Sequence, residues 1–164
     1  MIFKLVNEQY VKIFNLFIII LLPLVPLFLE LPYRVNIFVT WEGAYRMYIG
    51  QLPFKDFGMP IGYGFWIIPY IFFKLFGPYV ITLVKAQVFI NIVSMICFRA
   101  ILRMFRLSEV VVFFSLLVFY SSFVLINFWP WYNHTVFVFE MVAILFTLRY
   151  ILDHKSIINL ILGS

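Results

Sequence analysis

The chain has 164 residues, of which 65% are hydrophobic and only 12% are charged, and its mean hydropathy is +1.07. Soluble domains average about 45–50% apolar and about 25% charged residues, so this composition excludes an ordinary water-soluble protein and favours a chain embedded in lipid. The net charge of +5 does not indicate nucleic-acid binding, because the basic residues flank apolar segments, as the positive-inside rule predicts for membrane proteins.

The first predicted element is a membrane span over residues 11–30. Lys4 and Lys12 precede or open this apolar segment, and no small-residue cleavage site follows it, so we expect an uncleaved span rather than a signal peptide. The positive-inside rule then predicts a cytoplasmic N-terminus, in a multi-pass protein of a bacterial inner (plasma) membrane.

The second predicted element is an outer loop over 31–77 with two interfacial helices, at about 40–50 and 61–76. An ideal helix over 61–76 is about 24 Å long, short of a hydrocarbon core of about 30 Å, and Pro69 weakens it further. If this helix does not cross, the basic residues after span 78–98 fall on the same side as the N-terminus. We therefore expect the helix to lie in the interface.

The remaining predicted spans cover 78–98, 108–128 and 135–152, and a fifth begins at 157–164. Together they predict an all-α, multi-span helical integral membrane protein in a single membrane module, read from the sequence as a piece of a longer one. The single cysteine, Cys97, excludes an intrachain disulfide and a cysteine-based metal site.

Polar residues inside two of these spans need partners. Gln87, Asn91 and Ser94 share one face of span 78–98 and are expected to face other helices. Lys85 and Glu140 both fall about 10 Å below the outer surface, at about 1.5 Å per residue, where an isolated charge is costly. We expect them to form a structural ion pair, with a phosphate-binding role for Lys85 as the alternative.

Most of the remaining polar chemistry lies in the outer loop. Glu42 and Arg46 are four residues apart and share one face of the first interfacial helix, which Thr40 is expected to cap. Lys55 and Asp56 follow in the turn after it. A solvated helix pair on the surface explains Glu42 and Arg46 equally well, but polar loops on a rigid scaffold often carry function.

The order of motifs in this loop resembles one known family. The first matches are an acid that opens the helix, Glu42, and a Gly-x-x-Pro-Phe-x-Asp-Phe segment made of Gly50, Pro53, Phe54, Asp56 and Phe57. A Leu-Phe-Gly end follows at Leu75, Phe76 and Gly77. The last matches are a basic residue in the next span, Lys85, and a later turn at 131–135. This pattern resembles the GT-C superfamily, the ArnT-like and protein-mannosyltransferase-like membrane glycosyltransferases. In layout the resemblance covers the whole chain; its motifs cover about 41–77 and 131–135.

The resemblance implies a partial GT-C fold and an enzyme that takes sugar from a polyprenyl-phosphate carrier at the outer membrane face. Glu42 is then the expected catalytic base, with Asp56 in reserve, and a divalent metal (Mg or Mn) at Glu42 is possible in such enzymes. The residues expected to bind substrate phosphate are Arg46, Lys55, Lys85 and His134. Family members often carry a second acid near 133–134, where this chain has Asn133 and His134.

Two further readings stay open. One alternative is a non-enzymatic membrane subunit of a transporter or flippase, and the other is an inactive remnant of the enzyme. The partners expected from the sequence are membrane lipid, the lipid-linked donor, and either a partner membrane protein or the missing C-terminal part. The change Glu42→Gln separates an enzyme from a subunit, because only the enzyme loses transfer.

Overall fold

The computed structural model describes residues 8–30, 34–58, 62–125, 127–153 and 161. Within these ranges the chain is all-helical and has no β-strand, so the predicted fold class is confirmed at that level. The elements in chain order are α1 (Glu8–Leu21), the 3-10 helix η2 (Leu22–Phe28), α2 (Asn36–Tyr48), α3 (Gly64–Phe76), α4 (Val80–Met104), α5 (Glu109–Phe119), the π-helix η3 (Tyr120–Val124) and α6 (Tyr132–Asp153).

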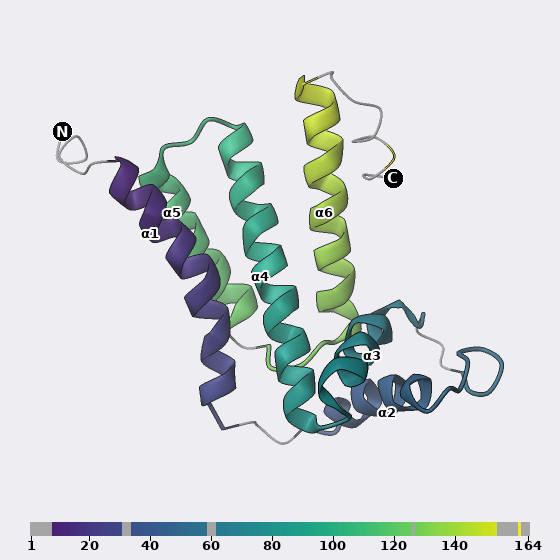
Figure 1. Cartoon of the computed structure of the whole chain (residues 1–164). Coiled ribbons are helices and arrows are strands. Elements are labelled where there is room, and N and C mark those ends of the chain that lie inside the picture. Colours follow the sequence, from purple (N-terminus) through teal and green to yellow (C-terminus); the bar gives the residue numbers. More distant parts are fainter. Residues whose placement is uncertain (1–7, 31–33, 59–61, 126, 154–160, 162–164) are drawn as a thin grey trace.

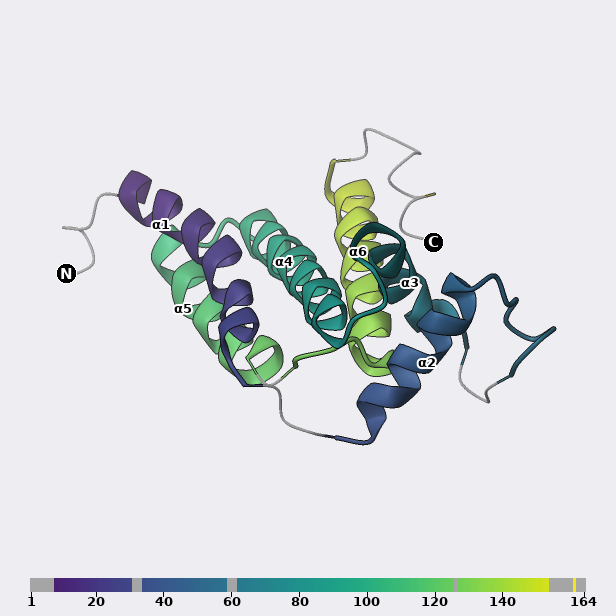
Figure 2. The ribbon, with the colours of Figure 1, turned by 60° about the horizontal axis from the view of Figure 1, so that its bottom comes forward.

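Helices α1, α4, α5 and α6 stand side by side, and α2 and α3 lie across one end of them (Figure 1). Helix α4 lies between the α1–α5 pair and α6, and the contacts of α4 with α5 and α6 agree with this order. Helices α2 and α3 pack on each other at the end where α4 and α6 begin. Figure 2, with the bottom of the molecule turned forward, shows α2 and α3 apart from the α1–α5 pair.

Within the part of the chain that the structure describes, three helices are long and apolar enough to cross a membrane: Glu8–Phe28, Val80–Met104 and Tyr132–Leu152. In the predicted span 108–128, the helix is the shorter apolar segment Glu109–Val124. A crossing at this place therefore stays a prediction. Of the predicted fifth span at 157–164, only Ile161 belongs to the described residues.

The first helix of the loop begins earlier than the sequence suggested. Helix α2 starts at Asn36, so Thr40 is not its cap. Thr40 is fully buried, and its hydroxyl donates to the carbonyl oxygen of Pro130 at 2.7 Å. The Thr40 side chain thus makes a tertiary hydrogen bond and does not cap the helix. Glu42 lies in the second turn of α2 and not in the first.

Helix α3 continues through Pro69 and ends at Phe76, where Gly77 adopts a φ of 84°. Phe73 of α3 is fully buried in a cluster with Ala44 and Leu83. This cluster joins α2 and α3 to the beginning of α4. It holds the two transverse helices in place against the upright ones.

A buried ionic network joins the opposite end of the upright helices. Glu109 at the start of α5 is 3% exposed and accepts hydrogen bonds from Arg99 Nη2 at 3.1 Å and from Asn15 Nδ2 at 2.8 Å. Arg103 Nε lies 3.4 Å from the same carboxylate. One carboxylate therefore links α1, α4 and α5.

The polar stripe of α4 faces protein, as its spacing predicts. Gln87, Asn91 and Ser94 are all fully buried, and Gln87 Nε2 donates to Asn91 Oδ1 at 2.8 Å. Polar side chains buried on a helix of this length favour contacts between helices over contact with lipid.

Candidate functional site

Helix α2 brings together Glu42, the expected catalytic base, and Arg46, an expected phosphate-binding residue. Because they are one turn apart, Arg46 donates to Glu42 Oε1 from Nη2 at 2.6 Å and from Nε at 3.0 Å. The side chains are 38% and 58% exposed for Arg46 and Glu42, respectively, so water reaches both groups. No described residue binds Glu42 Oε2 in the structure, which leaves this oxygen open to a ligand.

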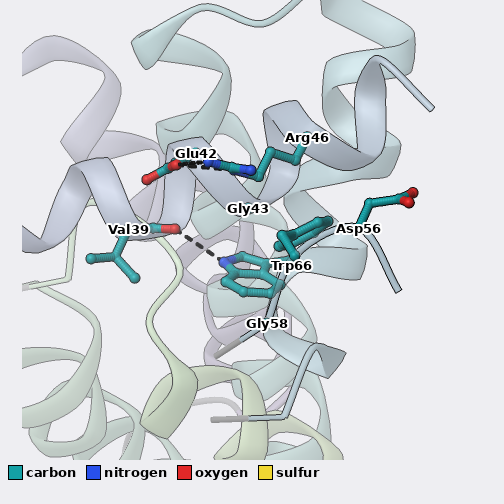
Figure 3. A pocket seen from close by; sticks show the side chains of 8 residues that line it. Val39, Glu42, Gly43, Arg46, Asp56, Gly58 and Trp66 are labelled. Carbon is teal, nitrogen blue, oxygen red and sulfur yellow. Dashed lines mark hydrogen bonds and ion pairs between the residues drawn. The ribbon is translucent and has the colours of Figure 1, made fainter. Parts of the chain in front are cut away.

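The turn after α2 positions Asp56. Gly50, with a φ of 93°, ends the helix in a conformation that glycine adopts without strain. Asp56 Oδ2 then accepts a hydrogen bond from the Leu52 amide at 2.8 Å, and the Asp56 amide donates to the Leu52 carbonyl at 2.9 Å. Asp56 thus closes a tight loop, and Figure 3 shows its carboxylate pointing away from Glu42.

A cavity of about 280 Å³ lies between α2, this loop and the start of α3. Its lining residues are Val39, Glu42, Gly43, Arg46, Asp56, Phe57, Gly58 and Trp66. The Arg46 guanidinium lies 5.5 Å from the centre of the Phe57 ring, a cation–π contact that restricts its side chain. The cavity thus offers a carboxylate and a held cation at one end of the helical bundle.

Trp66 forms the floor of the cavity (Figure 3). It is 2% exposed and its Nε1 donates to the Val39 carbonyl at 3.1 Å. The ring lies so close to Gly43 that a Cβ there would be 2.0 Å from Trp66 Cε2. Glycine at position 43 therefore lets α3 approach the backbone of α2.

The other predicted phosphate-binding residues do not join this cavity. Lys55 is exposed on the loop and does not line it. His134, in the first turn of α6, lines a separate cavity of about 210 Å³. Lys85 lies on α4 with its Nζ 4.5 Å from the centre of the Phe76 ring.

The structure contains no ion pair between Lys85 and Glu140, and neither charge forms an ion pair with another described residue. Glu140 is exposed and shares its face of α6 with Val136 and Ile144, both also exposed. Helix α6 instead turns Met141 towards α4. The depth of the two charges was inferred from the sequence, but their directions around the helices depend on tertiary packing.

The residues of the cavity do not suit a divalent metal ion. Among the described residues, no three His, Cys, Asp or Glu side chains gather closely enough to hold one. The Arg46 guanidinium already occupies Glu42 Oε1, so a cation bound there would meet a like charge. Asp56 uses one oxygen in its own loop and points away.

Gly43 and Trp66 are the members of the site that sequence reasoning missed. A glycine inside a helix costs about 1 kcal/mol relative to alanine, which signals a close approach to the backbone. The sequence contains that signal at Gly43, but it does not show which side chain approaches.

Comparison of the chain with family models, with curated proteins and with solved structures gives no match.

Proposed function

We propose that the chain is the N-terminal part of a membrane glycosyltransferase that takes a sugar from a polyprenyl-phosphate donor. The observation that carries this proposal is the Glu42–Arg46 pair in a cavity at the end of three helices that can span a membrane. A lipid-linked donor has its tail in the bilayer and its phosphate at the interface, so a site at the end of such helices matches its shape.

Arg46 is the residue suited to the departing phosphate. Negative charge grows on the phosphate as its bond to the sugar breaks, and a positioned guanidinium stabilises that charge. The Glu42 carboxylate and the Phe57 ring both restrict Arg46, so little ordering remains when the donor binds. Lys55 is exposed on the loop that follows α2 and does not line the cavity, so Arg46 is the cation that the proposal assigns to the phosphate.

Glu42 is the residue suited to proton transfer. The acceptor hydroxyl oxygen bonds to the anomeric carbon of the sugar while the bond from that carbon to the phosphate oxygen breaks. Glu42 Oε2 takes the hydroxyl proton as general base, and the bonding electrons leave with polyprenyl phosphate. Arg46 remains on Oε1 and on the phosphate, so the pair works as one unit.

The orientation in the membrane belongs to the same proposal. Helix α1 begins, and α4 and α6 end, at the end of the bundle opposite α2 and α3 (Figure 1). The basic residues Arg99, Arg103 and Arg149 lie in the C-terminal parts of α4 and α6, and Arg103 lies in the last turn of α4. The positive-inside rule then favours a cytoplasmic N-terminus and a site on the outer face, in a bacterial inner membrane.

A non-enzymatic role is favoured by one observation. Glu42 and Arg46 satisfy each other one turn apart and are both substantially exposed, and such pairs contribute only about 0.3–0.5 kcal/mol to a helix. A transporter or flippase subunit, or an inactive remnant, needs nothing more from them. Changing either residue then leaves function unaltered.

Transfer from labelled donors distinguishes these roles. Membranes containing the protein are supplied with radiolabelled polyprenyl-phosphate hexoses and pentoses, and both released polyprenyl phosphate and labelled acceptor are counted. Arg46→Gln should lower transfer at saturating donor by about 100-fold or more, the range for loss of a group that stabilises transition-state charge. Equal transfer by the wild type and Arg46→Gln contradicts the proposal.

A further inference from the structure

A second cavity, of about 210 Å³, lies where α2 and α6 begin. It combines polar side chains with flat aromatic ones: Arg34, Asn36, Asn127, Trp129, Trp131 and His134. The first cavity contains none of these residues. The proposed transfer step uses Glu42 and Arg46 and no residue of this second cavity. The sequence alone suggested a role for one of its residues, His134, as a phosphate-binding residue.

Two of its polar atoms lack a hydrogen bond of normal geometry. Asn36 Oδ1 is buried and has no hydrogen-bond partner in the structure, and His134 Nδ1 is buried without a hydrogen bond of normal geometry, although the Trp129 backbone lies close to the His134 ring. Buried polar atoms are nearly always paired, so this cavity calls for a ligand or water that completes them. The Asn36 amide can present either oxygen or NH₂, and a histidine nitrogen either donates or accepts. A hydroxyl group, which also donates and accepts, satisfies both.

The aromatic residues give this cavity rigid walls. Trp129 is 6% exposed and belongs to the cluster that holds α2 and α3 to α4. The Trp131 ring lies 6.1 Å from that of Phe65 and 5.1 Å from that of Tyr132. Asn127 is held through its Nδ2, which donates to the Phe123 carbonyl. Aromatic faces beside oriented amides suit a ligand that is apolar on its face and hydroxylated at its edge.

Arg34 lies at the edge of the cavity. It is exposed, and its guanidinium makes no ion pair with any described residue. Its planar fork of donors is free to bind two neighbouring oxygen atoms at once.

We propose that this second cavity binds a carbohydrate ring through its hydroxyl groups and serves as the acceptor subsite. The acceptor assignment rests on the function proposed above. Asn36 precedes Glu42 by six residues on α2, which places the two cavities about 9 Å apart along the helix axis. Trp66 in the first cavity packs on Phe65, and Phe65 packs on Trp131 in the second, so a row of packed aromatic rings connects their walls.

Direct binding of simple glycosides tests the subsite without any transfer step. The full chain is purified in a detergent without sugar, such as lauryldimethylamine oxide, and saturation-transfer NMR measures binding of methyl α-D-mannopyranoside and methyl β-D-glucopyranoside. We expect saturable binding, and monodeoxy analogues should bind about fivefold to tenfold more weakly where a hydroxyl bond is lost. Asn36→Leu should weaken binding by a similar factor, whereas the exposed control Glu140→Gln should not.

Several results overturn the subsite. The proposal is contradicted if the glycosides do not bind saturably, or if they and their deoxy analogues bind equally well. Displacement of the glycoside by millimolar inorganic phosphate also contradicts it. Unchanged binding by a folded Asn36→Leu protein also contradicts it, and the deoxy series decides if that variant does not fold. Glycoside binding without transfer leaves the sugar site standing and contradicts the enzyme, whereas transfer without glycoside binding contradicts the subsite alone.

Discussion

Substituting Gly43 with alanine should destabilise the protein although alanine favours helices. The added Cβ would lie 2.0 Å from Trp66 Cε2 and 2.3 Å from Cδ2 and Nε1, whereas carbon atoms pack at about 3.5–4.0 Å. The Trp66 ring cannot easily retreat, because Phe65 and Phe57 lie against it at 4.8 and 5.5 Å and its Nε1 is bonded to Val39.

The expected size follows from three opposing contributions. Overpacking costs about 1–3 kcal/mol, and the loss of the Trp66 hydrogen bond about 1 kcal/mol. Alanine returns about 1 kcal/mol of helix propensity. We therefore expect a net loss of about 1–3 kcal/mol from the free energy of unfolding.

Unfolding in detergent micelles, followed by circular dichroism, measures this loss. Gly64→Ala is the matched control, since a Cβ at the first residue of α3 has no neighbour within 4 Å. In a double-mutant cycle with Trp66→Leu, Gly43→Ala should become neutral or stabilising, because the ring that it strikes is gone. A Gly43→Ala protein as stable as the wild type refutes the proposed packing of α3 on α2.

Three other variants test the packing and the charges. Glu109→Ala leaves the Arg99 guanidinium without its buried carboxylate and should cost about 3–5 kcal/mol, whereas an unchanged unfolding midpoint contradicts the network. Thr40→Val removes the hydroxyl that bonds across to the turn before α6 and should cost about 1–2 kcal/mol in the same unfolding assay, and a neutral result argues against that bond. Lys85→Met and Glu140→Gln should have additive effects within about 0.5 kcal/mol, the limit for residues that do not touch; a larger coupling would revive the ion pair.

The sequence predicts the helical class and the C-terminal end of α3 because both depend on local signals. Apolar segments of about 20 residues predict helices that could span a membrane, and Gly77 marks the end of α3 at Phe76. The start of α2 was missed since Thr40 bonds to a residue 90 positions away. A long-range partner of this kind leaves no trace in the local pattern.

Charges were harder to assign than helices. Glu109 is buried by α1 and α4, which meet it only in the folded chain, so its sequence neighbours do not reveal its partners. The Glu42–Arg46 pair, in contrast, could be predicted, because one helical turn fixes it. The second cavity combines residues from before α2 and after η3, so neither stretch signals it alone.

Transfer by Glu42→Gln tests the central proposal most directly. The substitution preserves shape, and the exposed pair that it weakens contributes only about 0.3–0.5 kcal/mol, so the protein should insert and fold normally. Loss of a general base should lower transfer from polyprenyl-phosphate sugar by about 100-fold or more, while Glu140→Gln stays at the wild-type rate. Undiminished transfer by a folded Glu42→Gln protein would contradict the assignment of Glu42 as the catalytic base.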